Sequence, residues 1–150
     1  MSAIIDKLLG TSSDGKDIIE LGEIGTFIRG VTYSTEDLVE KNGIIVVRAN
    51  NLSNGAAVNI SNELVRINKK ISDSQMLVDG DIVICMANGS TALVGKASYY
   101  KESPNNTITF GAFCGTYRSN KKIVRWMMQT RKYKHAISKC IIAKTKRATF

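Results

Sequence analysis

The sequence predicts an α+β fold: a twisted, mostly β domain with a short N-terminal helix and a basic amphipathic C-terminal helix. Three observations predict it. Short β-branched or alternating segments recur between residues 18 and 118, separated by turns rich in Asn and Gly. After residue 121 the apolar positions recur at helical spacing instead. The chain has 150 residues, 43% hydrophobic and 23% charged, which is ordinary for one folded domain.

The elements are predicted in order along the chain. Residues 1–15 are expected to form an N-terminal helical arm, because residues 3–9 suit a helix and a Ser- and Gly-rich stretch then ends it. Residues 16–140 form the predicted domain, and residues 141–150, which have no periodicity, are predicted to be a flexible tail. Strands are predicted within residues 43–48, 59–67, 77–86 (after an initial turn), 92–100 and 107–118.

A single helix is predicted at about residues 121–139. Basic residues fall between its apolar positions, so one stripe is expected to face the core and the rest to carry positive charge. The apolar positions are Ile123, Trp126, Met127, Tyr133 and Ile137. The basic positions include Lys122, Arg125, Lys132 and Lys139.

The charge is divided unequally along the chain. The formal net charge is +8, yet all 13 acidic residues lie at or before Glu102. Residues 103–150 contain 11 Lys and Arg and no acidic residue. Such a distribution builds a positive face that attracts phosphate, although a solvated basic helix or a surface for an acidic protein has the same composition.

The residue inventory argues against catalysis. His135 is the only histidine, and it has no nearby carboxylate in the sequence with which to form a nucleophilic triad. The three cysteines lack metal-ligand spacing, and Cys85 and Cys114 lie in apolar segments that predict reduced core thiols. We therefore expect a non-enzymatic protein without a metal site or cofactor.

Two short segments imitate catalytic motifs. Residues 89–97 resemble a phosphate-binding loop, but the spacing of the glycines is wrong and Ala97 replaces the magnesium-binding hydroxyl. Asp14 and Lys16 have the spacing seen at nuclease sites, but they lie in a predicted turn. Pro104 is the only proline, which excludes the Asn-Pro-Pro segment of amino-methyltransferases.

The sequence also indicates where the protein acts. No apolar run approaches the roughly 20 residues that span a bilayer, and residues 1–7 carry charge where a signal peptide is apolar. We expect a soluble cytoplasmic protein.

Five segments in order resemble the specificity subunits of type I restriction–modification systems. Residues 21–33 resemble the opening of a target recognition domain, and residues 45–52 resemble its next landmark. Residues 79–84 (Asp-Gly-Asp-Ile-Val-Ile) are similar to a recurrent strand entry, and residues 89–96 and 110–114 resemble the family's later segments in the same order. The resemblance covers roughly residues 16–140. The N-terminal arm fits the way in which such a subunit begins, so this looks like a first recognition domain. The sequence ends at Phe150, before the family's long spacer helix and second domain, as in a fragment, a frameshifted product or a half-subunit.

The resemblance implies binding to double-stranded DNA. In the family, each recognition domain recognises one half of a bipartite target, methyltransferase subunits methylate adenine with S-adenosylmethionine, and a restriction subunit cuts DNA with ATP. The recognition domain performs neither reaction. A second recognition domain or a homodimer would supply the other half-site.

Such a domain needs side chains that recognise base edges and cations that hold phosphates. Arg and amide side chains suit guanine and adenine, respectively, although Asn is also common in turns for its own conformational reasons. The predicted base-contacting residues are Arg29, Tyr33, Arg48, Asn50, Asn51, Asn88 and Ser90. The predicted phosphate-contacting residues are Lys96, Arg118, Lys121, Lys122, Arg125, Arg131 and Lys132.

Two alternatives remain open. The chain could be an interaction module that binds methyltransferase subunits or another acidic protein without recognising DNA. It could also be an enzyme, such as a nuclease with a metal site that the sequence does not reveal.

Overall fold

The computed structural model describes residues 20–61, 63–143 and 148–149, so the predicted arm at residues 1–15 lies outside the described residues. The predicted α+β class is confirmed. The helices are α2 (Leu21–Ile24), α3 (Ile123–Met127) and α4 (Arg131–Ala143), with short 3-10 helices η1 (Thr35–Asp37), η2 (Ala49–Asn51), η3 (Asp73–Gln75) and η4 (Thr91–Leu93). The strands are β1 (Thr26–Arg29), β2 (Ile44–Val47), β3 (Val65–Ile67), β4 (Ile82–Cys85), β5 (Ala87–Asn88), β6 (Ala97–Tyr99), β7 (Ile108–Phe110), β8 (Cys114–Arg118) and β9 (Ala148–Thr149).

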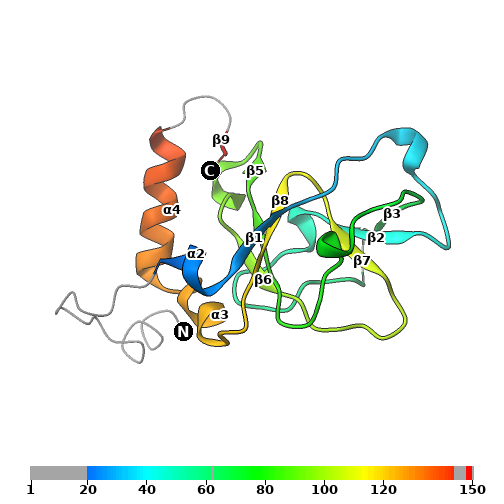
Figure 1. The fold of residues 1–150 in the computed structure, drawn as a ribbon. Helices are drawn as coiled ribbons and strands as arrows, with labels where there is room; N and C mark the ends of the chain where they lie inside the picture. Colours follow the sequence, from blue (N-terminus) through cyan, green and yellow to red (C-terminus); the bar gives the residue numbers. More distant parts are fainter. Residues whose placement is uncertain (1–19, 62, 144–147, 150) are drawn as a thin grey trace.

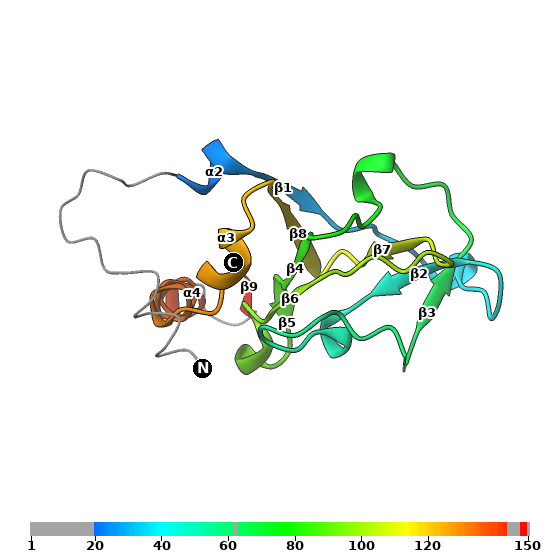
Figure 2. The same ribbon diagram turned by 90° about the horizontal axis from the view of Figure 1, so that it is seen from below.

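The strands form two main sheets. The first has the order β1-β8-β4-β6 and is antiparallel throughout. The second has the order β3-β2-β7, in which β2 and β7 run parallel. Figures 1 and 2 show α3 and α4 at one end of an elongated molecule and the β3-β2-β7 sheet at the other.

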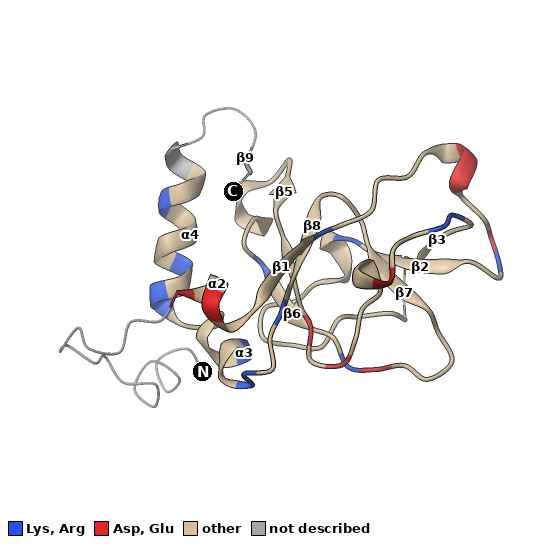
Figure 3. Ribbon diagram, viewed as in Figure 1, with Lys and Arg blue, Asp and Glu red and all other residues tan. Residues whose placement is uncertain are grey.

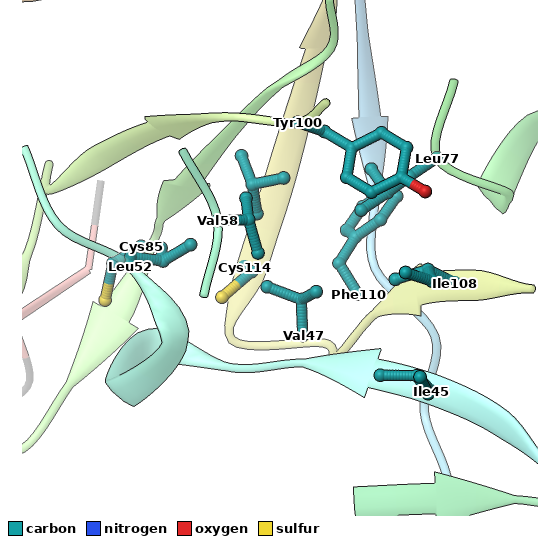
Figure 4. Close-up of a cluster of buried hydrophobic side chains, with 11 residues drawn as sticks. Ile45, Val47, Leu52, Val58, Leu77, Cys85, Tyr100, Ile108, Phe110 and Cys114 are labelled. Atoms are coloured by element: carbon teal, nitrogen blue, oxygen red, sulfur yellow. The ribbon is translucent and has the colours of Figure 1, made fainter. Parts of the chain in front are cut away.

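The main core lies between the two sheets (Figure 4). Ile45 and Val47 of β2 meet Val83 and Cys85 of β4 there, together with Phe110 of β7. The other face of β4 packs into a second cluster with α3, so this strand is buried on both faces. That double burial explains why its sequence is continuously apolar rather than alternating.

The second cluster joins the helices to the first sheet. Val124 and Met128 pack against Ile82 and Ile84 of β4, with Tyr133 of α4 at the margin. The predicted single helix is therefore wrong. It divides at residues 128–130, because the Thr130 hydroxyl accepts the Tyr133 N–H and caps a new helix.

This division also changes which apolar residues are buried. Tyr133 and Ile137 face the core as predicted, whereas Ile123, Trp126 and Met127 of α3 remain exposed. The phase of the apolar stripe shifts at the capped break, so one helical period cannot describe both helices.

Three of the predicted strands are shorter or divided. Of residues 59–67, only β3 pairs, while Ile60 and Leu64 pack against the main core. Residues 92–100 begin with η4 and turn at Gly95, where φ is +81°, before β6. Residues 107–118 divide into β7 and β8, because the Cys114 N–H donates to the Gly111 carbonyl and closes a turn.

The predicted tail is also partly ordered. Helix α4 extends to Ala143, and β9 pairs antiparallel with β5, joining Ala148 to Asn88. These pairings correct the prediction for the described part of residues 141–150. The lack of periodicity did not indicate β9, because a strand of two residues is too short to show an alternating pattern and depends on pairing with β5.

Candidate nucleic-acid interface

The turn between β7 and β8 (residues 111–113) is the point at which three other strands end. The Gly30 N–H, directly after β1, donates to the Cys114 carbonyl at 3.3 Å. The Gly111 N–H donates to the Val47 carbonyl at the end of β2, at 2.9 Å. After β4, the Met86 and Ala87 N–H groups both donate to the Phe113 carbonyl, at 2.8 and 3.1 Å.

These bonds place three predicted base-contacting residues around one turn. Arg29 precedes Gly30, Arg48 follows Val47, and Asn88 follows Ala87. Glycine at position 30 is required sterically, because a β-carbon there would lie 2.1 Å from the Gly111 carbonyl oxygen. Close contact between backbones therefore brings together three chain segments that lie far apart in the sequence.

Arg48 and Asn50 share one acidic partner that the sequence did not reveal. The Arg48 guanidinium donates to the Glu63 carbonyl at 3.1 Å, and the Asn50 amide donates to the Glu63 carboxylate. Glu63 itself has a left-handed backbone, with φ +52°. An exposed carboxylate therefore lies directly beside Asn50, and the backbone of the same residue holds Arg48. The sequence offered no signal for this contact because 13 residues separate Glu63 from Asn50.

Asn51 is not available to a duplex. It is 2% exposed, and its side-chain oxygen accepts the Arg48 N–H at 2.9 Å, which caps η2. The local turn role of asparagine therefore applies at this position.

Three other predicted base-contacting residues lie in local structure. Asn88 is half-buried in β5, and its oxygen accepts the Ser90 N–H at 2.9 Å, while Ser90 itself is exposed. Tyr33 is half-buried and packs against Val31 and Val46 on the outer face of the second sheet. Ser90 and Asn88 thus remain near the β7–β8 turn, whereas Tyr33 contributes to packing.

Arg118 is committed to an internal ion pair. Its guanidinium donates to both oxygens of Asp81, at 2.8 and 2.7 Å, and to the Met76 carbonyl. Asp81 is 1% exposed, and this pairing raises the pKa of Arg118. Arg118 therefore holds a buried carboxylate, while its predicted phosphate contact stays a prediction.

Arg125 stacks on aromatic rings. Its guanidinium carbon lies 3.4 Å from the centroid of Tyr99 and 5.0 Å from that of Trp126. Its Nε is buried without a hydrogen-bond partner among the described residues. Such stacking fixes the helix against the sheet, so Arg125 is a packing residue rather than a free cation.

The remaining predicted phosphate contacts lie on or beside the helices. Figure 3 shows Lys and Arg along α3 and α4. Lys121, Lys122, Arg131 and Lys132 are exposed. Lys96 is half-buried, and its carbonyl accepts the Cys85 N–H, which places it between the end of β4 and the helices. We call Lys121, Lys122, Arg131 and Lys132 the basic flank.

A polar cleft of about 640 Å³ opens at the other end of β2. Gly43 precedes β2 and Thr107 precedes β7, whereas the β7–β8 turn meets the opposite ends of both strands. Asn42, Arg66 and Asn105 also line the cleft. It therefore does not include the predicted base-contacting residues.

The described residues offer little for other kinds of site. Residues 20–61, 63–143 and 148–149 contain no group of three His, Cys, Asp or Glu side chains placed to hold a metal. Cys85 and Cys114 are buried and unpaired, as predicted, and burial raises the pKa of Cys114 to about 12. Among the described helices, none has the length and apolar character that crossing a bilayer requires.

Comparison with known sequences identifies two relatives. No family model matches the chain. It is 36% identical over 118 residues to the type I restriction enzyme EcoKI specificity subunit of Escherichia coli K12 and 34% identical over 118 residues to the StySPI specificity subunit of Salmonella potsdam. Each match covers 76% of this chain and 25% of the relative, so the chain corresponds to a quarter of their length.

Comparison with solved structures supports the fold. The HsdS subunit from Thermoanaerobacter tengcongensis aligns with a TM-score of 0.57 and 12% identity, over 79% of this chain and 29% of that one. A chain solved in a study of complex assembly and conformational transition of the type I R-M system aligns with a TM-score of 0.60 and 14% identity, over 83% of this chain and 32% of that one.

Proposed function

We propose that this chain, which belongs to the specificity-subunit family of type I restriction–modification systems, binds DNA sequence-specifically as a target recognition domain. One observation carries the proposal. Arg29, Arg48 and Asn88 are brought by backbone hydrogen bonds to a single turn. Base recognition requires several forked donors and acceptors at one place, and the segments that meet at this turn carry residues of those types.

The basic flank supplies the second requirement. Cations directly before α3 and at the start of α4 would hold phosphates without regard to sequence, and acidic residues are missing from this part of the chain. The flank fixes the position of a duplex, while side chains at the β7–β8 turn contact the bases.

We further propose that the chain recognises one half of a bipartite target and has no catalytic role. Methylation with S-adenosylmethionine and ATP-dependent restriction would belong to partner subunits, in the cytoplasm. A second recognition domain or a homodimer would contact the other half-site. Co-purification with methyltransferase and restriction subunits tests this assembly, and a chain that binds neither would contradict it.

Selection of duplexes from a random pool tests the central proposal. The purified chain is expected to enrich a short half-site, because the base-contacting side chains are few and held on one scaffold. Failure to enrich any sequence, with methyltransferase subunits still bound, would favour an interaction module instead. Metal-dependent cleavage of DNA by the purified chain would contradict the non-catalytic assignment.

A further inference from the structure

Phe113 lies at the β7–β8 turn and is the most exposed large apolar side chain among the described residues. It is 73% exposed, whereas the others in this group reach at most 45%. Burial of a phenylalanine side chain stabilises a fold in proportion to the apolar area removed from water. Most of the Phe113 side chain stays in water, so it adds little to folding stability.

The backbone that carries this ring is firmly held. The Phe113 carbonyl accepts two N–H groups, from Met86 and Ala87, and the turn is closed by the Cys114 N–H bond to Gly111 at 2.8 Å. The next residue, Cys114, is 2% exposed and packs in the main core. The ring therefore projects from a fixed point, and ordering it for binding requires little further loss of backbone entropy.

The surroundings of the ring favour a nucleic acid as its partner. The turn's other exposed side chain is Ala112, so no wide apolar patch of the kind that a protein partner covers is built from these residues. Three polar residues are direct sequence neighbours of residues whose backbones hydrogen-bond at the turn. They are Arg29, Arg48 and Asn88. A partner must combine an apolar surface with hydrogen-bonding edges, as base pairs do in the major groove.

We propose that Phe113 is a specificity-determining residue that packs its ring against the C5-methyl group of a thymine in the half-site. The base edges in the major groove otherwise present hydrogen-bond donors and acceptors, so the thymine methyl is the apolar group there. Phenylalanine is among the side chains that contact it. This inference rests on the proposed DNA binding and adds a residue that the predicted base contacts do not include. Sequence patterns concealed it, because a continuous strand through residues 107–118 would place Phe113 within a sheet.

The test combines a protein variant with a modified duplex. After selection of the half-site, each thymine is replaced in turn by uracil, which removes only the methyl group. Wild-type protein is expected to lose affinity roughly fourfold at one position, the value of about one buried methyl group. On the thymine duplex, Phe113→Ser should bind more weakly than wild type by a similar factor. Replacing that thymine by uracil should then cause no further loss of affinity in Phe113→Ser.

Controls separate this inference from the proposed function. Leu38→Ser removes another exposed apolar side chain, 45% exposed and bridged to Ile67 at the cleft end of the second sheet, and should leave affinity unchanged. Thermal unfolding of both variants confirms that they fold. If wild-type protein binds no specific duplex, the proposed function fails.

Other outcomes overturn the role of Phe113 alone. They are specific binding with no uracil-sensitive position, equal uracil losses in wild type and Phe113→Ser, or unchanged DNA affinity accompanied by lost binding of a methyltransferase subunit. The last result would assign the ring to a protein contact.

Discussion

Arg118 donates to both carboxylate oxygens of Asp81, at 2.8 and 2.7 Å, and so neutralises a charge that is only 1% exposed. The Val78 N–H donates to the same carboxylate at 3.0 Å. The pair joins the turn before β4 to the end of β8, and it contributes to folding.

Asp81→Asn is therefore expected to destabilise the domain. Removing one partner of a buried ion pair costs about 3–5 kcal/mol, and we expect the low end because the Arg118 side chain is 30% exposed. Chemical denaturation measures the change. Asp79→Asn is the control, because Asp79 is exposed and accepts one backbone N–H, from Glu102. Equal stability of the two variants would show that the buried pair is not important for folding.

Glu63→Gln is expected to strengthen DNA binding. The amide can still accept from Asn50, but the negative charge beside the proposed base contacts is removed. One unit charge about 4 Å from a phosphate contributes roughly 1 kcal/mol in water, or about fivefold in Kd. Titrations at low and high salt measure the gain, which should shrink as salt rises. Weaker binding would mean that Glu63 itself contacts a base, and Glu36→Gln, on η1, is the control.

Lys122→Ala is expected to weaken binding to all sequences alike. Each lost phosphate contact lowers the slope of log K against log salt by about 0.9. Arg125→Ala should leave that slope unchanged, because its guanidinium stacks on Tyr99. Lys70→Ala, exposed and distant in sequence from the helices, controls for general charge. Equal slopes for wild type and Lys122→Ala would remove Lys122 from the interface.

The cysteines are expected to differ in reactivity. In the folded protein an alkylating reagent should modify exposed Cys140 and spare buried Cys85 and Cys114, while all three react after denaturation. Mass spectrometry counts the modified thiols. Modification of Cys114 at the same rate as Cys140 would contradict its burial.

The pKa of Cys114 also gives a pH dependence. Burial raises this pKa from 9.0 to about 12, so the folded state keeps the thiol proton that the unfolded state loses. The associated stability is complete below about pH 9 and is lost as the pH rises toward 12. A stability profile that rises across this interval, when compared with Cys114→Ala, would contradict the assignment.

The sequence predicted the buried strands better than it predicted the turn and the helix break that follow other elements. The β-branched run that became β2 and the turn and strand around β4 were visible as local patterns. The β7–β8 turn was not, because Gly111 lies between two apolar segments that look continuous. The division between α3 and α4 depends on Thr130 acting as a cap, which helical spacing does not indicate.

The candidate site was predictable only by residue type. Arginine and asparagine after an apolar strand indicated Arg48 and Asn50, but not whether each side chain is exposed. Asn51, one position later, caps η2 from inside the domain. The basic composition after residue 103 likewise did not reveal that Arg118 is paired with Asp81 and that Arg125 lies on Tyr99. Such partners lie far away in the sequence, and only the folded chain brings them together.

The most direct test is the ratio of Kd values for a scrambled duplex and the selected half-site, measured for Arg29→Ala, Asn88→Ala and Lys122→Ala. The two substitutions beside the β7–β8 turn should each lower this ratio by the equivalent of about 1–3 kcal/mol, while Lys122→Ala weakens both duplexes equally and preserves it. A ratio that is unchanged by Arg29→Ala and Asn88→Ala, in variants that remain folded, would contradict recognition of DNA at this turn.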